Sequence, residues 1–450
     1  MGKLPLILTL LVIMPVMTRD SLAQTETLLY TFTGGSDGGV PYAGLLADGQ
    51  GHLYGTAQQY ADGSCTLGYA GCGTVFELTP TEAGWNFKVL HTFHGGEDGA
   101  NPSSSLVFDS NGNLYGTTVS GGTGCGGYGC GTVFELRRSG DGWQESILYR
   151  FTGRADGEDP IGSVALDGAG NIYGTTAYGG DNSCFYEGVG CGVVFQLKRS
   201  NAVDDEWTET VLHTFHGTDG AEPFVGVTLV PPQSNFPKSV GPPGTIYGTT
   251  LYGGEGQPGD IGGGVVFQVM PSGDSWSYRT LYEFSHLGGR PGGPLTFDDQ
   301  GNLYGMAGLN GRFGAGSVFE VRRMGPEGSD WIETDIYSFR GPPDDGWFPL
   351  YQGVVMDQAG NLYGSTPGGG TSPNCFGGCG TEFRLSKSNG IWSESMVYSL
   401  TGNADGWSPF AGGPVVDEQG NIYAVTPFGG DTNGLGLGQP GCGVVFRISP

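Results

Sequence analysis

Six aspartates occupy equivalent places in a loop that recurs along the chain with the pattern G-x-x-D-G-x-x-P or a close variant. Ca²⁺ prefers oxygen ligands, so a ring of these carboxylates could bind calcium, the one cofactor that the sequence suggests. The alternative, which the Asp-Gly pair favours, is that each Asp closes a turn on its own backbone while glycine supplies a positive φ. The six residues are Asp37, Asp98, Asp156, Asp219, Asp345 and Asp405.

Large aromatic residues lie in the same loops. Rings exposed at one rim would suit stacking on sugar rings or contact with an apolar partner. The alternative is that they fill the loops from inside. These candidate ligand-binding residues are Trp347, Trp407, Phe348, Phe410, Tyr42 and Phe224.

No motif for catalysis is present in the sequence, which lacks G-x-S-x-G, a P-loop and H-E-x-x-H. His91 and His94, like His213 and His216, are three residues apart in expected strands, so their side chains should point to opposite faces. We therefore interpret these histidines as packing residues. An active site assembled from several repeats remains an open alternative.

Eight of the nine cysteines form close pairs, each ending just before the glycine of a "GTVFEL"-like stretch. A structural zinc site needs four ligands, and no histidine is near the pairs. In an exported chain the spacing predicts four local disulfides. Cys442 has no partner and is interpreted as a free thiol or an intermolecular link. The predicted pairs are Cys65–Cys72, Cys125–Cys130, Cys184–Cys191 and Cys375–Cys379.

The formal net charge of the 450 residues is −26, which disfavours polyanionic partners such as nucleic acids and anionic membranes. Residues 1–23 contain one lysine, an apolar run and the small-residue ending "SLA", and they are predicted to be a signal peptide. The apolar run is too short for a comfortable membrane span. We expect a secreted monomer, extracellular or periplasmic.

The residues between these candidates repeat seven times. Each repeat has a short apolar run, then "LYGTT", then "GTVFEL", then an aromatic stretch such as "ILYRF", all in close variants. The pieces are β-branched or aromatic and are bounded by Gly, Asn, Asp or Pro, so each predicts a strand. We name these strands A, B, C and D in that order.

Seven units of four antiparallel strands predict an all-β, seven-bladed β-propeller over residues 28–450. The mature chain begins on a D strand and ends on a C strand, so the first strand should complete the last blade. A glycine in the middle of most B strands, as in "LYGTT", is expected to seat an aromatic ring. The B–C and D–A loops should share one face, which we predict to be the binding face.

The phrase "GNLYGTT…GG…GTVFEL" resembles the GloVer tandem repeat, named for Gloeobacter and Verrucomicrobium, over nearly all of residues 28–450. The resemblance implies an exported or surface-anchored bacterial repeat protein and no particular activity. Members often end in a sorting anchor. This chain ends in "VVFRISP" without one, which favours free secretion.

Three hypotheses for the function follow. The first is a secreted propeller that binds a glycan, a surface polymer or a protein through the B–C/D–A face. The second is an extracellular polysaccharide lyase or hydrolase, which would need two or more acids in a conical pocket. The third is a structural envelope protein.

Overall fold

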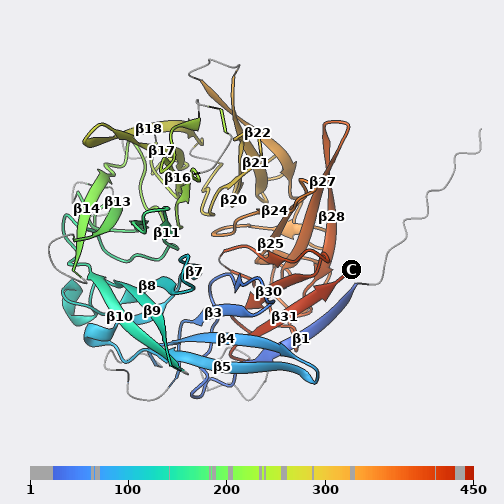
Figure 1. Cartoon of the computed structure of the whole chain (residues 1–450). Coiled ribbons are helices and arrows are strands. Elements are labelled where there is room, and N and C mark those ends of the chain that lie inside the picture. The colour runs from blue at the N-terminus through green and yellow to red at the C-terminus, as the bar shows by residue number, and fades with distance from the viewer. Residues whose placement is uncertain are drawn as a thin grey trace, which may run out of the picture.

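The computed structural model places seven sheets around a central axis, as predicted (Figure 1). Strand A of each sheet lies nearest the axis and strand D forms the rim, where Figure 1 shows β5, β10, β14 and β28. The chain is described over residues 24–61, 65, 71–140, 142–181, 184, 189–200, 206–232, 236–237, 240–254, 261–285, 288–324, 330–410, 412–430 and 441–450. The predicted signal peptide, residues 1–23, lies outside these ranges.

The first four sheets follow the repeat. Sheet one has β2 (Leu46–Ala47), β3 (Leu53–Ala57), β4 (Thr74–Thr81) and β5 (Gly84–Thr92). Sheet two has β7 (Val107–Phe108), β8 (Leu114–Ser120), β9 (Thr132–Ser139) and β10 (Gly142–Arg150), and β6 (Ala100–Pro102) also pairs with β8. Sheet three has β11 (Ala165–Leu166), β12 (Ile172–Thr176), β13 (Val193–Arg199) and β14 (Trp207–Thr214). Sheet four has β15 (Thr228–Leu229), β16 (Ile246–Thr250), β17 (Val265–Ser272) and β18 (Ser275–Glu283).

The last three sheets complete the ring. Sheet five has β19 (Thr296–Phe297), β20 (Leu303–Ala307), β21 (Ser317–Arg323) and β22 (Trp331–Ser338). Sheet six has β24 (Val355–Met356), β25 (Leu362–Thr366), β27 (Thr381–Ser388) and β28 (Ile391–Ser399), with a small extra pair, β23 (Gly346–Trp347) and β26 (Gly368–Gly369), beside it. Sheet seven has β29 (Val415–Val416), β30 (Ile422–Thr426), β31 (Val444–Ser449) and β1 (Thr25–Thr31).

The first strand closes the ring as predicted. β1 pairs antiparallel with β31, from Thr25 opposite Ser449 to Thr31 opposite Val444. Sheet seven therefore takes three strands from the end of the chain and one from its start, which leaves no open seam between the two ends. The strand begins three residues before Leu28, where the aromatic pattern begins.

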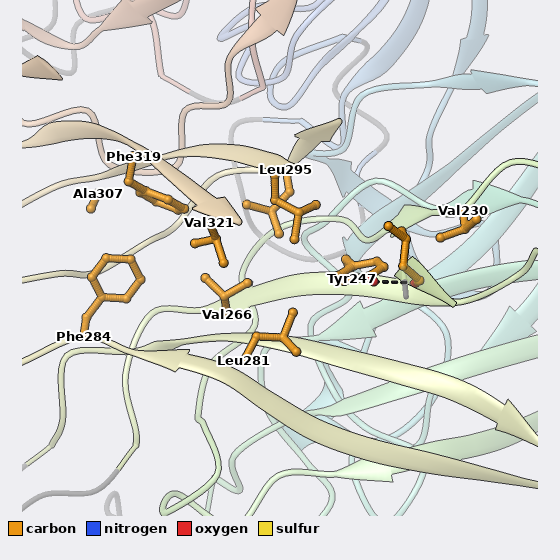
Figure 2. Packing of buried hydrophobic residues seen from close by; sticks show 11 residues of the cluster. Val230, Tyr247, Val266, Leu281, Phe284, Leu295, Ala307, Phe319 and Val321 are labelled. Atoms are coloured by element: carbon orange, nitrogen blue, oxygen red, sulfur yellow. Dashed lines mark hydrogen bonds between the residues drawn. The ribbon is translucent and has the colours of Figure 1, made fainter. Parts of the chain in front are cut away.

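The core lies between adjacent sheets. In the cluster shown in Figure 2, Val266 and Leu281 of sheet four pack with Leu295, Phe319 and Val321 from the start and body of sheet five. The mid-strand glycines seat aromatic rings as expected: a Cβ added to Gly55 would lie 2.5 Å from Cζ of Phe76 on the next strand. Each sheet thus buries strand B on both faces.

The four predicted disulfides are confirmed, and each pins a B–C loop to the start of strand C. Cys442 is buried and belongs to none of these four disulfides. Disulfides of this kind are typical of proteins outside the cytoplasm. No helix in the described ranges is long and apolar enough to cross a membrane.

Candidate binding site

Each D–A loop fixes its backbone in the same unusual way. The residue before the loop's proline has φ between 56° and 58°, a left-handed conformation that few residues other than glycine adopt. Its N–H donates to a carbonyl just before strand C of the preceding sheet, as from Glu222 to Cys191 and from Val40 to Cys442. The seven residues in this conformation are Val40, Asn101, Asp159, Glu222, Arg290, Phe348 and Ser408.

The residues that follow these prolines meet at the central axis. Together with the A strands they line a cavity of about 660 Å³ that runs from the D–A loops to Asp357, just past strand β24. Its walls are mostly small side chains, glycines and strand residues such as Val355 and Val416. The cavity is large enough for a small ligand or one end of a chain-like ligand.

An arc of aromatic rings borders this cavity on the D–A side. The ring of Tyr42 lies 4.6 Å from that of Phe410, and Phe410 lies 5.4 Å from Tyr351. Tyr351 lies 5.4 Å from Phe224, whose far side meets Tyr178 at 6.0 Å. The four rings of Tyr42, Phe410, Tyr351 and Phe224 come from four loops, are half-buried, and line the cavity. All four offer apolar faces and the two tyrosines add a hydroxyl group, a combination that suits stacking on a sugar.

Two acids, the buried Glu222 and the half-buried Asp159, lie beside one end of the arc. Burial raises the pKa of Glu222 to about 7, and burial with the nearby Glu158 carboxyl raises the pKa of Asp159 to about 7. Both act on Tyr178, whose pKa lies above its usual range because of its own burial and then of Glu222 and Asp159. Burial, with Tyr252 and Glu222 nearby, raises the pKa of Tyr351 to about 12. Near neutral pH these two acids can therefore hold or release a proton.

The tryptophans form a separate groove. Trp347 and Trp407, both half-buried, line a cavity of about 450 Å³ together with Phe348, Phe376 and Phe410. Trp407 stacks on Phe428 at 4.6 Å, while Phe376 stands fully exposed at the edge. Because Phe410 lines both cavities, the groove adjoins the central site. All six predicted aromatic residues thus lie on one face, and ligand binding by them stays a prediction.

The six aspartates lie apart from these cavities, each within its own loop. Asp37 accepts hydrogen bonds from the Thr33 amide at 2.8 Å, the Thr33 hydroxyl and the Tyr30 hydroxyl at 2.9 Å. Asp156 and Asp405 repeat this pattern, and Asp345 accepts from Tyr337 and two amides. Asp98 and Asp219 face histidines instead of a tyrosine. The bonds are those of a turn-closing side chain, and calcium binding stays a prediction.

Residues 16–236 and 230–434 match the sequence profile of the Gloeobacter/Verrucomicrobia repeat. The chain belongs to this family. A comparison with curated proteins finds no match.

Several solved structures are similar to this Gloeobacter/Verrucomicrobia repeat protein at low sequence identity. An ancestral GH74 enzyme is 11% identical with a TM-score of 0.53, and the match covers 92% of this chain and 48% of that one. A putative oxidoreductase (glucose dehydrogenase) of Thermus thermophilus is 13% identical (TM-score 0.37, 94% and 99% covered). A PL25 ulvan lyase is 11% identical (TM-score 0.44, 95% and 94% covered). The likeness to the GH74 enzyme shows the fold alone.

Sequence reasoning on this repeat protein missed Tyr351, Tyr178, Asp159 and Glu222. Tyr351 reaches the axis because its loop, "PLYQG", is one residue longer than "PFVG". Asp159 and Glu222 occupy the position before proline, which carries a different residue in every loop. That variation within a constant pattern was the signal available in the sequence.

Proposed function

We propose that this chain is an exported binding propeller that holds a glycan on its B–C/D–A face, over the central cavity. The arc of Tyr42, Phe410, Tyr351 and Phe224 around the cavity carries the proposal. Sugar rings present C–H faces to aromatic rings and hydroxyl groups to polar neighbours, and the arc with its adjacent acids supplies both. The adjoining tryptophan groove would extend the contact to a longer chain.

The test is binding of the purified chain to a panel of bacterial and plant glycans, with calcium and with chelator. We expect Phe410→Ala and Tyr351→Ala each to weaken binding by about two- to tenfold, since each removes one stacking ring, worth roughly 0.5–1.5 kcal/mol. Trp347→Ala and Trp407→Ala should weaken binding only of longer glycans. Ile391→Ala, at an exposed C–D turn on the other face, is the control.

The two outcomes against the proposal are distinct. Glycan binding that survives loss of both arc rings would place the site elsewhere. No binding under any condition would favour a protein partner or a structural role in the envelope. Loss of glycan binding on addition of chelator would indicate that the aspartates of the Asp-Gly loops bind calcium.

A second candidate function is a polysaccharide lyase or hydrolase. The observation that favours it is the pair Asp159 and Glu222, whose pKa values near 7 suit a general acid or base. If glycans that bind are also cleaved, new chain ends will appear. Glu222→Gln and Asp159→Asn should then abolish cleavage while binding remains, and cleavage by both variants would exclude this assignment.

A further inference from the structure

One junction between adjacent sheets differs chemically from the other six. His91 near the end of β5, Asp98 in the short helix η1 (Gly96–Asp98) and Glu145 on β10 face one another across sheets one and two. One ligand atom of each lies within 4.8 Å of the other two. Within the described ranges, this is the only such group of three His, Cys, Asp or Glu side chains.

The polar atoms in this group are buried but poorly satisfied. Nε2 of His91 lies 3.4 Å from Oδ1 of Asp98 and makes no hydrogen bond of good geometry. Oε1 of Glu145 is likewise buried without a hydrogen-bond partner. Asp98 is held in place by the His94 amide, which donates to its other oxygen at 2.7 Å. Three atoms that could each bind a metal ion, one from each side chain, are therefore held close together.

The equivalent junctions differ at the place of His91 rather than at that of Glu145, because Oε1 of Glu26, Glu209 and Glu333 is likewise buried without a hydrogen-bond partner. In most of them a tyrosine takes the place of His91 and donates its own proton, as from Tyr149 to Asp156 at 3.1 Å. At the junction with a second histidine, His213 lies 2.9 Å from Asp219 in a formed hydrogen bond, and Tyr278 stacks on its ring at 3.8 Å. A carboxylate, an imidazole and a second carboxylate meet only at the first of these junctions among the described residues.

We propose that His91, Asp98 and Glu145 form a binding site for a divalent transition-metal ion of the Zn²⁺ class, with three protein ligands and one open position. Imidazole nitrogen suits zinc and its neighbours, whereas Ca²⁺ takes six or more oxygens. Two ligands at about 2.0–2.1 Å from a tetrahedral ion lie about 3.3–3.4 Å apart, which matches the separation of His91 and Asp98. Arg150 is the cation whose charge acts on Glu145. Its Nε–H donates a hydrogen bond to the Glu97 carbonyl oxygen at 3.1 Å.

A metal here would connect β5 and η1 of one sheet to β10 of the next. It would add a bond between two blades that also meet through packed side chains and through hydrogen bonds such as that from the Asn101 N–H to the Cys72 carbonyl. The site lies at the rim of the B–C/D–A face, and it does not depend on the glycan proposal.

The experiment is Zn²⁺ titration of the untagged chain by calorimetry, in excess Mg²⁺ so that isolated carboxylates do not contribute. We expect one site, weakened at least tenfold in His91→Tyr and in Glu145→Gln. His91→Tyr should fold, because tyrosine occupies this position in five other sheets: Tyr30, Tyr149, Tyr282, Tyr337 and Tyr398. His213→Tyr is the matched control and should bind Zn²⁺ as the parent does.

Two further measurements use the same proteins. Zn²⁺ should raise the Tm of the parent and of His213→Tyr, with no rise in His91→Tyr, because only binding to the folded state stabilises it. Co²⁺ bound at the site should show d–d absorption without a thiolate band, which separates this site from Cys442. No tight site in the parent, or equal affinity in His91→Tyr, would overturn the proposal. Preference for Ca²⁺ that survives His91→Tyr would overturn it as well.

Discussion

Glu382 carries a carboxyl group inside the protein where the other six sheets carry valine. It lies on strand C of sheet six, is fully buried, and accepts one hydrogen bond from the Ser365 hydroxyl at 2.8 Å. Burial raises the pKa of Glu382 to about 8, partly offset by the bond from Ser365. The equivalent residues are Val75, Val133, Val194, Val266, Val318 and Val445.

This residue should make stability depend on pH. The folded state favours the protonated carboxyl, so its contribution is complete below the ordinary value of 4.5 and is lost as the pH rises toward about 8. The slope in that window is at most about 1.4 kcal/mol per pH unit. We expect Glu382→Val to raise the free energy of unfolding by about 2–4 kcal/mol at pH 8 and by much less at pH 5.

Urea unfolding at the two pH values measures this difference. Glu82→Gln, at an exposed turn, serves as the control and should show no widening gap. An equal effect of Glu382→Val at both pH values would show that its carboxyl is not protonated in the folded state.

At the scale of the strand, the packing of B against C depends on the missing Cβ of a glycine. A Cβ on Gly248 would lie 2.4 Å from Cζ of Phe267. Sheet seven carries Ala424 opposite Phe446, so the position accommodates a methyl group once its neighbours adjust. Replacing the equivalent glycine of another sheet by alanine should therefore destabilise the protein without preventing folding.

We expect Gly248→Ala to lower the free energy of unfolding by about 1–3 kcal/mol, the usual effect of overpacking. Gly49→Ala is the matched control, because a Cβ there meets no atom within 4 Å. Chemical denaturation checks both. Equal stability of the two variants would mean that the Phe267 ring can move aside freely.

The strands, the disulfides and the glycine positions could be predicted from the sequence because each depends on a local residue pattern that recurs along the chain. Strand alternation, cysteine spacing and the glycine seats recur in most units, so each copy supports the others. The site is different, because Tyr351, Phe224 and Tyr178 belong to separate repeats and meet only through the closure of the ring. The pairing of His91 with Glu145 likewise depends on how one sheet stacks against the next.

The whole molecule depends on the strand that joins its two ends. β1 fills the outer edge of sheet seven, and Leu29 and Phe32 pack with Leu53 and Phe76 of sheet one. We expect a chain that begins at residue 34 to have a lower Tm and to aggregate, because the edge of β31 would be open. Adding a peptide of residues 24–33 should restore both properties, and a scrambled peptide should not. An unchanged Tm would show that the pairing contributes little.

The left-handed residues before the prolines have a consequence for how this fold can vary. Their position is set by main-chain hydrogen bonds, so the chain path there is indifferent to which side chain it carries, and valine, asparagine, acids, arginine, phenylalanine and serine all occur. At the four of these places whose side chains are partly exposed, Asp159, Arg290, Phe348 and Ser408, a point mutation can therefore change one patch of the loop-bearing face and leave the architecture as it was. The repeated segments build the ring, whereas the side chain before each proline can change without altering the ring. Variation of the protein's binding surface and conservation of its architecture are thus assigned to different residues.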